Sequence, residues 1–232
     1  RDELKTRKPA LPPRLKTIDG VKMLTPEDGD AGGTWMAVNE YGLTVCLLNY
    51  YDRPYELMSG ESFTSRGLLV LALAGKRSVS EAQHYLDTES MRHYRAFHVL
   101  MLDKSDCASA TWNGERITHD SAPLCPMSSS SYETQFVITG RQRLFRDIFA
   151  SSTPSPEALF EFQQSHLPEK GPFSVCMHRP EAGTVSHSHV RVTDDLAEYS
   201  YIDGAPCEGV RLPAISLDLS RGEPTAQHQQ RD

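Results

Sequence analysis

The chain has 232 residues, with 24 Lys and Arg against 31 Asp and Glu, which gives a formal net charge of −7. This balance supplies no overall positive field for nucleic acid or an anionic membrane surface, so neither is an expected partner. The longest apolar run, residues 68–74, is far shorter than the roughly 20 residues that cross a bilayer, so we expect no membrane span. The first residues are charged and unlike a signal peptide, and the length suits one domain.

The first half of the chain begins with residues 1–31, which alternate charge and proline without a helical or strand period. This pattern predicts an extended arm lying on a domain rather than part of a core. Residues 34–39 and 43–50 are rich in β-branched and aromatic side chains around Glu40-Tyr41-Gly42, which predicts a hairpin. The second of these strands is apolar on both faces, which indicates layers packed above and below its sheet.

Two helices are expected next, forming one helical layer. Thr64 or Ser65 can cap a helix that runs to Gly75, where glycine suits a left-handed stop. This helix is apolar all round and is predicted to be buried. Ser78 or Ser80 opens a second, amphipathic helix toward Leu86.

A strand over residues 96–102 should follow, with both faces covered. Residues 107–112 and 115–119 then predict a hairpin around Asn113-Gly114, a pair that tolerates the positive φ of a type I′ turn. Apolar residues from Phe136 to Phe149 recur at helical spacing, and a short helix is expected from Glu157 to about Ser165. These two helices would form a second helical layer.

The C-terminal third is predicted to return to strand, over residues 173–177, 184–193, 196–202 and 211–219. Residues 220–232 are polar and are expected to be a disordered tail, which leaves residues 1–219 as a single domain. Strands and helices in this order, with sheets buried on both faces, predict an α/β (α+β) protein in which two sheets stack between helical layers.

The five cysteines, an odd number without a C-x-x-C pair, form neither a zinc-knuckle pattern nor a disulfide framework. A reducing cytoplasm is therefore the expected compartment. Cys46 and Cys176 lie in apolar runs, where a thiol is more often a small buried hydrophobe than a nucleophile or a metal ligand.

Motifs along nearly the whole chain resemble the Asn-Arg-Asp-Glu (NRDE) family, whose eukaryotic members are called transport and Golgi organisation 2. They are Arg1-Asp2-Glu3 with Arg7 and Pro9, residues 32–39 (Gly-Gly-Thr-Trp-Met-Ala-Val-Asn) with Gly42, Leu48-Asn49-Tyr50, Ser65-Arg66-Gly67, residues 127–131, Ser174-Val175-Cys176-Met177 and Thr184-Val185-Ser186. The resemblance implies a four-layer αββα sandwich similar to amino-terminal-nucleophile (Ntn) hydrolases, in agreement with the layering argued from periodicity.

The resemblance also implies a catalytic cysteine directly after the initiator methionine, on a first strand that ends in Asn-Arg-Asp-Glu. The sequence given starts at Arg1, so that strand, its asparagine and the nucleophile are not in it. The chain as given is therefore expected to be inactive, through truncation or loss of the catalytic group. A missing strand would also leave its neighbour's backbone groups unpaired, which favours edge pairing or aggregation.

In an Ntn amidase the α-amine of the first residue is the base for its own side chain, so no separate His-Asp pair is needed. Such a site requires a cation and a carboxylate nearby and hydrogen-bond donors for the tetrahedral oxyanion. By resemblance Arg1 and Asp2 are the charged candidates, although a charged pair at a chain end is usually a solvated terminus. Asn49 is the candidate oxyanion donor, and its plain alternative is a turn residue that ends a strand.

Arg66, Ser128 and Ser129 are the candidate substrate-binding residues. Arg66 can hold a substrate carboxylate or instead pair with Asp52 or Glu61, since its charge opposes the helix dipole. The serines 128–131 can present hydroxyls and amides to a substrate, although four serines in a row more often form a flexible loop.

The histidines give no metal site from spacing alone. His187, His189 and Arg191 alternate on one strand face, and a His-x-His pair can bind metal, but without a third ligand a solvated outer face is favoured. His98 is expected to be a hydrogen-bonded core histidine rather than a haem or metal ligand. No metal or cofactor is expected.

Two functions from different classes remain open. The first is a cytoplasmic Ntn-type hydrolase or acyltransferase that acts on a linear amide or thioester when its N-terminal cysteine is present. The alternative is a non-enzymatic binding or trafficking protein that uses the same fold for haem, a tetrapyrrole, or a lipid-like ligand. The expected partner is a small molecule in either case.

Overall fold

A computed structural model of the chain describes residues 1–51, 62–123, 125–150 and 154–220. Its larger sheet has seven strands that follow the chain order, each antiparallel to the next. They are β2 (Leu11–Ile18), β3 (Val21–Glu27), β4 (Met36–Asn39), β5 (Thr44–Asn49), β6 (Phe97–Leu102), β7 (Cys107–Trp112) and β8 (Ile117–Asp120).

The second sheet is built around β11 (Leu196–Asp203), which pairs with β10 (Ser186–Val192), β12 (Val210–Arg211) and β13 (Ile215–Asp218). β1 (Asp2–Leu4) pairs with β9 (Ala182–Thr184), which leads directly into β10. The backbone nitrogen of Arg1 donates to the Ser186 carbonyl at 2.8 Å, so the β1 ladder continues to the start of β10.

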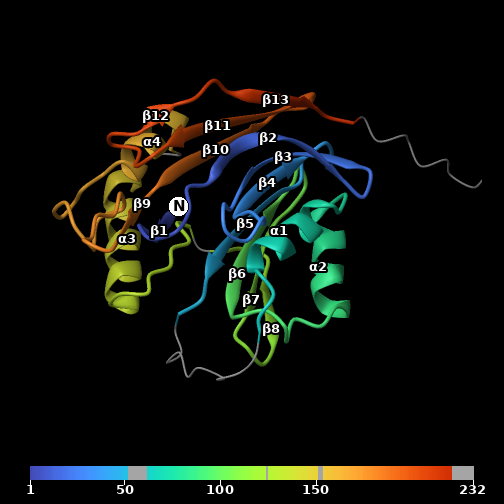
Figure 1. The fold of residues 1–232 in the computed structure, drawn as a ribbon, viewed down its shortest axis with the longest axis horizontal. Coiled ribbons are helices and arrows are strands. Elements are labelled where there is room, and N and C mark those ends of the chain that lie inside the picture. Colours follow the sequence, from blue (N-terminus) through green and yellow to red (C-terminus); the bar gives the residue numbers. More distant parts are fainter. Residues whose placement is uncertain (52–61, 124, 151–153, 221–232) are drawn as a thin grey trace, which may run out of the picture.

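In the described part of the chain, four helices cover the two sheets, arranged as in Figure 1. α1 (Arg66–Ala74) and α2 (Val79–Thr88) pack on the larger sheet, whereas α3 (Thr134–Phe149) and α4 (Pro156–Gln163) lie on the side of the second sheet. Serine caps start three of them, because Ser65, Ser78 and Ser155 each accept a hydrogen bond from a backbone N–H of the first turn.

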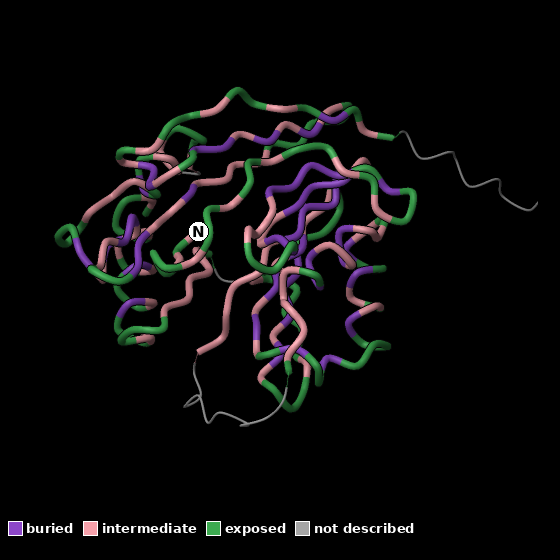
Figure 2. Tube along the Cα trace, viewed as in Figure 1, coloured by how far each residue is buried: buried purple, intermediate pink, exposed green. Residues whose placement is uncertain are grey.

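Two hydrophobic clusters lie between the layers and hold them together. One joins the larger sheet to α1 and α2 through fully buried residues such as Val45, Leu73 and Phe97. The other packs Leu24 and Val38 of the larger sheet against β11 and β13 of the second. Buried residues accordingly concentrate in the central strands and the inner faces of α1 and α2 (Figure 2). The predicted α+β fold with two stacked sheets between helical layers is confirmed.

The interpretation of residues 1–31 as an arm outside the core is wrong. They form β1, β2 and β3, and Met23, Leu24 and Thr25 of β3 are buried. Strand periodicity is hidden there for two reasons. The β2–β3 register shifts between Leu11 and Arg14, and residues 23–26 of β3 are buried in succession because layers cover both faces.

Three further expectations about elements need correction. Residues 173–177 form no strand and instead belong to the irregular connection between α4 and β9. Gly75 ends α1 with a right-handed φ of −77°, and Leu68 on that helix is 42% exposed, so the helix is not buried all round. The β7–β8 hairpin turns over residues 113–116, with a positive φ at Gly114 alone, rather than through a two-residue type I′ turn.

Candidate functional site

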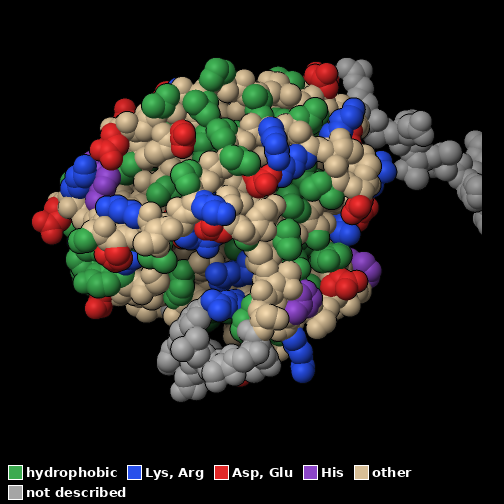
Figure 3. Space-filling view, in the orientation of Figure 1, with side chains coloured by type: hydrophobic (Ala, Val, Ile, Leu, Met, Phe, Trp, Pro, Cys, Tyr) green, Lys and Arg blue, Asp and Glu red, His purple; other side chains and the backbone are tan. Residues whose placement is uncertain are grey.

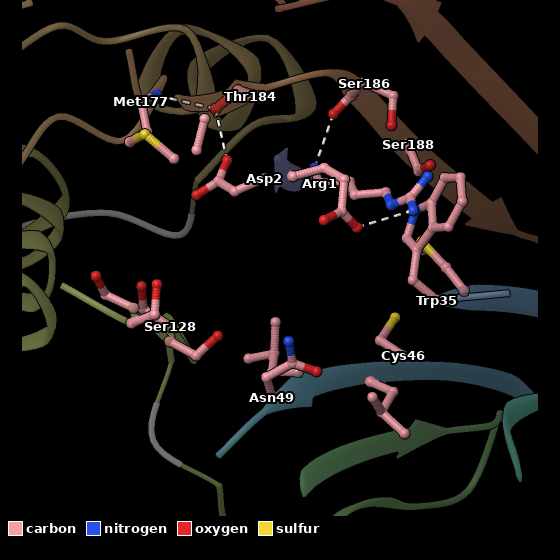
Figure 4. A pocket seen from close by; sticks show the side chains of 18 of the residues that line it. Arg1, Asp2, Trp35, Cys46, Asn49, Ser128, Met177, Thr184, Ser186 and Ser188 are labelled. Carbon is pink, nitrogen blue, oxygen red and sulfur yellow. Dashed lines mark hydrogen bonds and ion pairs between the residues drawn. The ribbon is translucent and has the colours of Figure 1, made fainter. Parts of the chain in front are cut away.

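A pocket of about 720 Å³ lies where the two sheets meet the α3 side of the molecule. One wall comes from β1, β9 and β10, which carry Arg1, Asp2, Thr184 and Ser186 (Figure 4). The facing wall comes from β5, whose Cys46 and Asn49 point toward the same space. The loop of serines before α3 closes a third side.

All six residues singled out from the sequence line this one pocket. They are Arg1, Asp2, Asn49, Arg66, Ser128 and Ser129. They come from β1, β5, the start of α1 and the loop before α3, so only tertiary folding brings them together. Their catalytic and binding roles stay predictions.

The Arg1 side chain is 9% exposed and firmly held, rather than a solvated terminus. Its guanidinium donates to the Glu3 carboxylate at 3.0 Å and forms an ion pair with Asp28. It also lies 4.2 Å from the centre of the Trp35 ring, a cation–π contact. These contacts occupy the guanidinium of Arg1 and fix it in the pocket wall at the start of β1.

Asp2 faces the pocket from β1, and one of its carboxylate oxygens is fixed by a hydrogen bond. Thr184 donates its hydroxyl to Asp2 Oδ1 at 2.6 Å, and Arg141 Nη2 lies 3.8 Å from Oδ2. A carboxylate that is oriented on one side and open on the other can position an amine or an amide N–H of a ligand.

Arg141 is the cation that sequence reasoning missed. It is 9% exposed on α3 and donates to the Ser174 carbonyl at 2.8 Å and to Ser128 Oγ at 3.1 Å. Its Nε has no hydrogen-bond partner among the described residues. Burial lowers the pKa of its guanidinium, and the nearby Asp2 carboxylate opposes that shift. Its signal in the sequence was an arginine one turn after Val137 on the apolar face of α3.

Asn49 ends β5, and its side-chain amide donates to the Tyr51 hydroxyl at 2.7 Å. Both the Asn49 amide and the Tyr51 hydroxyl therefore lie at the pocket surface. This position on the wall opposite Asp2 suits a donor to an oxygen bound between the two walls (Figure 4).

Two nucleophilic or basic groups of the pocket are tuned by burial. Burial raises the pKa of the Cys46 thiol to about 12, so it stays protonated at neutral pH and is a poor nucleophile, as predicted. Its side chain nevertheless lines the pocket and is half-buried, where the sequence predicted a buried hydrophobe. Burial also lowers the pKa of His187 to about 4, so its ring is neutral at pH 7. His187 lines the pocket and contacts the Phe160 ring, so the expectation that it lies on a solvated face is wrong.

The pocket is rich in arginine although the protein is acidic. Figure 3 shows Lys and Arg side chains gathered at the centre of one face. Among the described lining residues, the cations are Arg1, Arg7, Arg66, Arg95, Arg141 and Arg179, and the carboxylates are Asp2, Glu3 and Asp28. This excess of positive charge favours a ligand with an anionic group.

Arg66 at the start of α1 donates from Nη1 to the Ala96 carbonyl at 2.9 Å. Its proposed partners Asp52 and Glu61 lie outside the described residues. His98, by contrast, is hydrogen-bonded as expected, with Nδ1 2.7 Å from the Thr111 hydroxyl.

Solved structures place this architecture in a known class. The chain is similar to a mutant conjugated bile acid hydrolase from Clostridium perfringens, with a TM-score of 0.52 and 11% identity over 93% of this chain and 85% of that one. Another variant of the same hydrolase gives a TM-score of 0.49 and 12% identity over 95% and 92% of the two chains. The first of these two similarities shows that the fold is that of the Ntn hydrolases.

The family follows from the sequence itself. Residues 1–193 match the family model of Transport and Golgi organisation 2, the NRDE family, so the chain belongs to this family. Curated proteins give no match. Within the described residues, no helix has the length and apolar character needed to span a membrane.

Proposed function

We propose that the pocket is the active site of an Ntn-type hydrolase or acyltransferase that cleaves a linear amide or thioester carrying an anionic group. The observation that carries the proposal is the convergence of Asp2, Arg141 and Asn49 on one pocket at the start of β1. This is the set of groups that an N-terminal nucleophile needs: a carboxylate, a cation and an oxyanion donor.

The nucleophile in this proposal is a cysteine in a segment of the natural chain that precedes Arg1. Cys46 is unsuited because its thiol stays protonated at neutral pH. The nitrogen of Arg1 already bonds to Ser186 in the pocket wall, so a preceding residue would start within reach of the pocket. Arginines of the pocket other than Arg1, whose guanidinium is already paired, would hold the substrate's anionic group while Asn49 donates to the developing oxyanion.

The test begins with the natural protein isolated from its own cells, by intact mass and N-terminal sequence, followed by assay against linear acyl amides and acyl-CoA thioesters. We expect an N-terminal cysteine, turnover, and no turnover by residues 1–232 alone. Asn49→Ala should lower kcat by about 10²-fold or more. Asn113→Ala, in the β7–β8 turn outside the pocket, is the matched control and should leave kcat unchanged.

Absence of turnover by the natural protein, together with no covalent adduct from a thiol-reactive acyl analogue, would overturn the proposal. A natural chain that starts without a nucleophile would do the same.

The second candidate is a haem or tetrapyrrole-binding function, and the observation that favours it is His187. Its neutral imidazole in an arginine-rich pocket is the type of group that ligates haem iron, with arginines for the propionates. Titration with haem should then shift the Soret band, and His187→Ala should abolish the shift. His119→Ala, outside the pocket, should retain it. No shift in the unmodified protein would remove this candidate.

A further inference from the structure

Four potential metal ligands converge at one point behind the pocket. They are His166, Cys176, His178 and Cys207, and their ligand atoms all lie within 4.8 Å of one another. They come from three places in the chain: the residues after α4, the connection before β9, and the loop between β11 and β12. None of these four residues lines the pocket described above.

Four of the six separations between the ligand atoms are close to those of a tetrahedral zinc site, and the other two are under 4.8 Å. His166 Nε2 and His178 Nε2 are 3.2 Å apart, and the sulfurs of Cys176 and Cys207 are 3.5 Å apart. Each sulfur is 3.5 Å from His178 Nε2. Zinc bond lengths in a regular tetrahedron give edges of about 3.3 Å for N···N, about 3.6 Å for N···S and about 3.8 Å for S···S.

Hydrogen bonding alone does not account for this convergence. His178 Nε2 has three neighbours at 3.2–3.5 Å, namely His166 Nε2 and the two sulfurs. A ring nitrogen has one proton or one lone pair in the ring plane, so it satisfies one such partner and not three. A cation at the centre of the four atoms would be bound by all of them at once.

A disulfide does not account for it either. The distance of 3.5 Å between the sulfurs of Cys176 and Cys207 is well above the S–S bond length of about 2.05 Å. Both cysteines are free in the structure.

The backbone around the ligands is fixed by hydrogen bonds although it is irregular. The Cys176 N–H donates to the Ser165 carbonyl and the His178 N–H to the Gly171 carbonyl, each at 3.0 Å. In the β11–β12 loop, the Glu208 N–H donates to the Ala205 carbonyl, also at 3.0 Å. The scaffold thus presents the ligands before a metal binds, which lowers the entropic cost of binding.

The cluster lies directly behind the pocket wall. Val175, Met177 and Arg179 line the pocket, whereas Cys176 and His178, which alternate with them, belong to the cluster. Pro206 lines the pocket next to Cys207 in the same way. A metal here would tie together the two segments that form this part of the wall.

We propose that His166, Cys176, His178 and Cys207 form a structural zinc site that fixes the rear wall of the pocket. On binding, the two thiols lose their protons to solvent as two Zn–S bonds form, and the two neutral imidazoles bind through Nε2. Two thiolates balance the charge of Zn²⁺, so the bound site is electrically neutral and suits a partly buried position. Four protein ligands leave no open position, which is typical of structural rather than catalytic zinc.

The test is the metal content of the full chain, produced without a polyhistidine tag in zinc-supplemented medium under mild reducing conditions. We expect about one zinc per chain. Replacement by Co²⁺ should give the visible d–d bands of tetrahedral cobalt and a near-ultraviolet thiolate-to-cobalt band. The paired variant Cys207→Ser with His178→Gln should lose the zinc and the cobalt bands, whereas Cys125→Ser, an exposed cysteine outside the cluster, should keep both.

The cobalt titration of the unmodified chain keeps the proposal testable if the paired variant fails to fold. Absence of zinc as purified, together with no thiolate-to-cobalt band on titration, would overturn the site. An intact mass lower by two hydrogens in a metal-free chain would assign the pair to a disulfide and also overturn it. Retention of stoichiometric zinc by the paired variant would contradict the proposed ligands.

Discussion

At the scale of single residues, Asn39 shows how a buried polar side chain joins two elements. It is fully buried at the end of β4, and its amide nitrogen donates to the carbonyls of Ala74 and Lys76 at 2.8 and 2.6 Å. Its oxygen accepts from the backbone N–H groups of Tyr41 and Leu43. All four hydrogen bonds of the amide are made, so Asn39 fixes the β4–β5 turn against the end of α1.

Asn39→Asp should therefore lower the free energy of unfolding by about 2–4 kcal/mol, because a buried carboxylate would face two carbonyl oxygens that it cannot bond. Urea unfolding followed by circular dichroism measures the change. Asn113→Asp is the matched control. Asn113 uses its side-chain oxygen only as an acceptor, from the N–H groups of Glu115 and Arg116, so a carboxylate can replace it at a cost under about 0.5 kcal/mol. Equal effects of the two changes would contradict this account.

At the scale of elements, two glycines let α1 approach the loop before β4. A side chain on Gly33 would overlap the backbone of Gly67, and a Cβ on Gly67 would lie 2.7 Å from the Thr34 nitrogen. The Thr34 N–H donates to the Gly67 carbonyl at 3.1 Å across this contact. Glycine is needed at both positions because backbone meets backbone there. This contact places Arg66 and Trp35 at the pocket wall.

Gly67→Ala should destabilise the protein by about 1–3 kcal/mol, because the backbone atoms in contact cannot move aside as a flexible side chain would. Gly140→Ala on α3 is the comparison, since a Cβ there meets nothing within 4 Å. That change should stabilise the protein by about 0.5–1 kcal/mol through helix propensity. Thermal and urea unfolding of both variants measure the sign of each change in the free energy of unfolding. A Gly67→Ala protein more stable than the unmodified one would show that the contact is loose.

At the scale of the whole molecule, an ion-pair network joins the start of the chain to the larger sheet. Asp28, after β3, pairs with the guanidinium groups of Arg1 and Arg7. Burial raises the pKa of Asp28, but hydrogen bonds from the N–H groups of Ala31 and Asp30 and the two arginines outweigh it and hold the pKa below its ordinary value. The network holds β1, and with it Asp2, at the mouth of the pocket.

This network predicts a pH dependence of stability. Because the folded pKa of Asp28 lies below the unfolded one, its contribution is complete above about pH 4 and is lost as the pH falls through the folded pKa. Asp28→Asn should thus be less stable than the unmodified protein at pH 7, by on the order of 2 kcal/mol, and the difference should shrink toward pH 3.

Urea unfolding between pH 3 and 7 measures this difference. Asp147→Asn, which removes an exposed pair with Arg143, should change stability by under about 0.5 kcal/mol. A constant difference between Asp28→Asn and the unmodified protein across the pH range would contradict the assignment to Asp28.

The layered fold could be predicted from the sequence because hydrophobic patterns are local. Short stretches of apolar residues with caps or turns predict the β4–β5 hairpin and the capped helices α1 and α2. Apolar residues at helical spacing predict α3, which has no side-chain cap. The motifs around Gly33 and Gly67 gave the family, and their close contact now explains why glycine stands there. Where both faces of a strand are buried and the register shifts, as in β2 and β3, the local pattern gave no periodicity and the arm prediction was wrong.

The grouping of residues in the site, in contrast, depends on how distant segments pack. Asp2 and Asn49 were found from motifs, but Arg141 and His187 reach the pocket only because α3 and β10 pack beside β1. The cluster of His166, Cys176, His178 and Cys207 is likewise invisible in the spacing of the cysteines, because its ligands meet through loops far apart in the chain. Local patterns encode secondary structure through short-range burial, whereas a site of converging side chains depends on how distant segments pack.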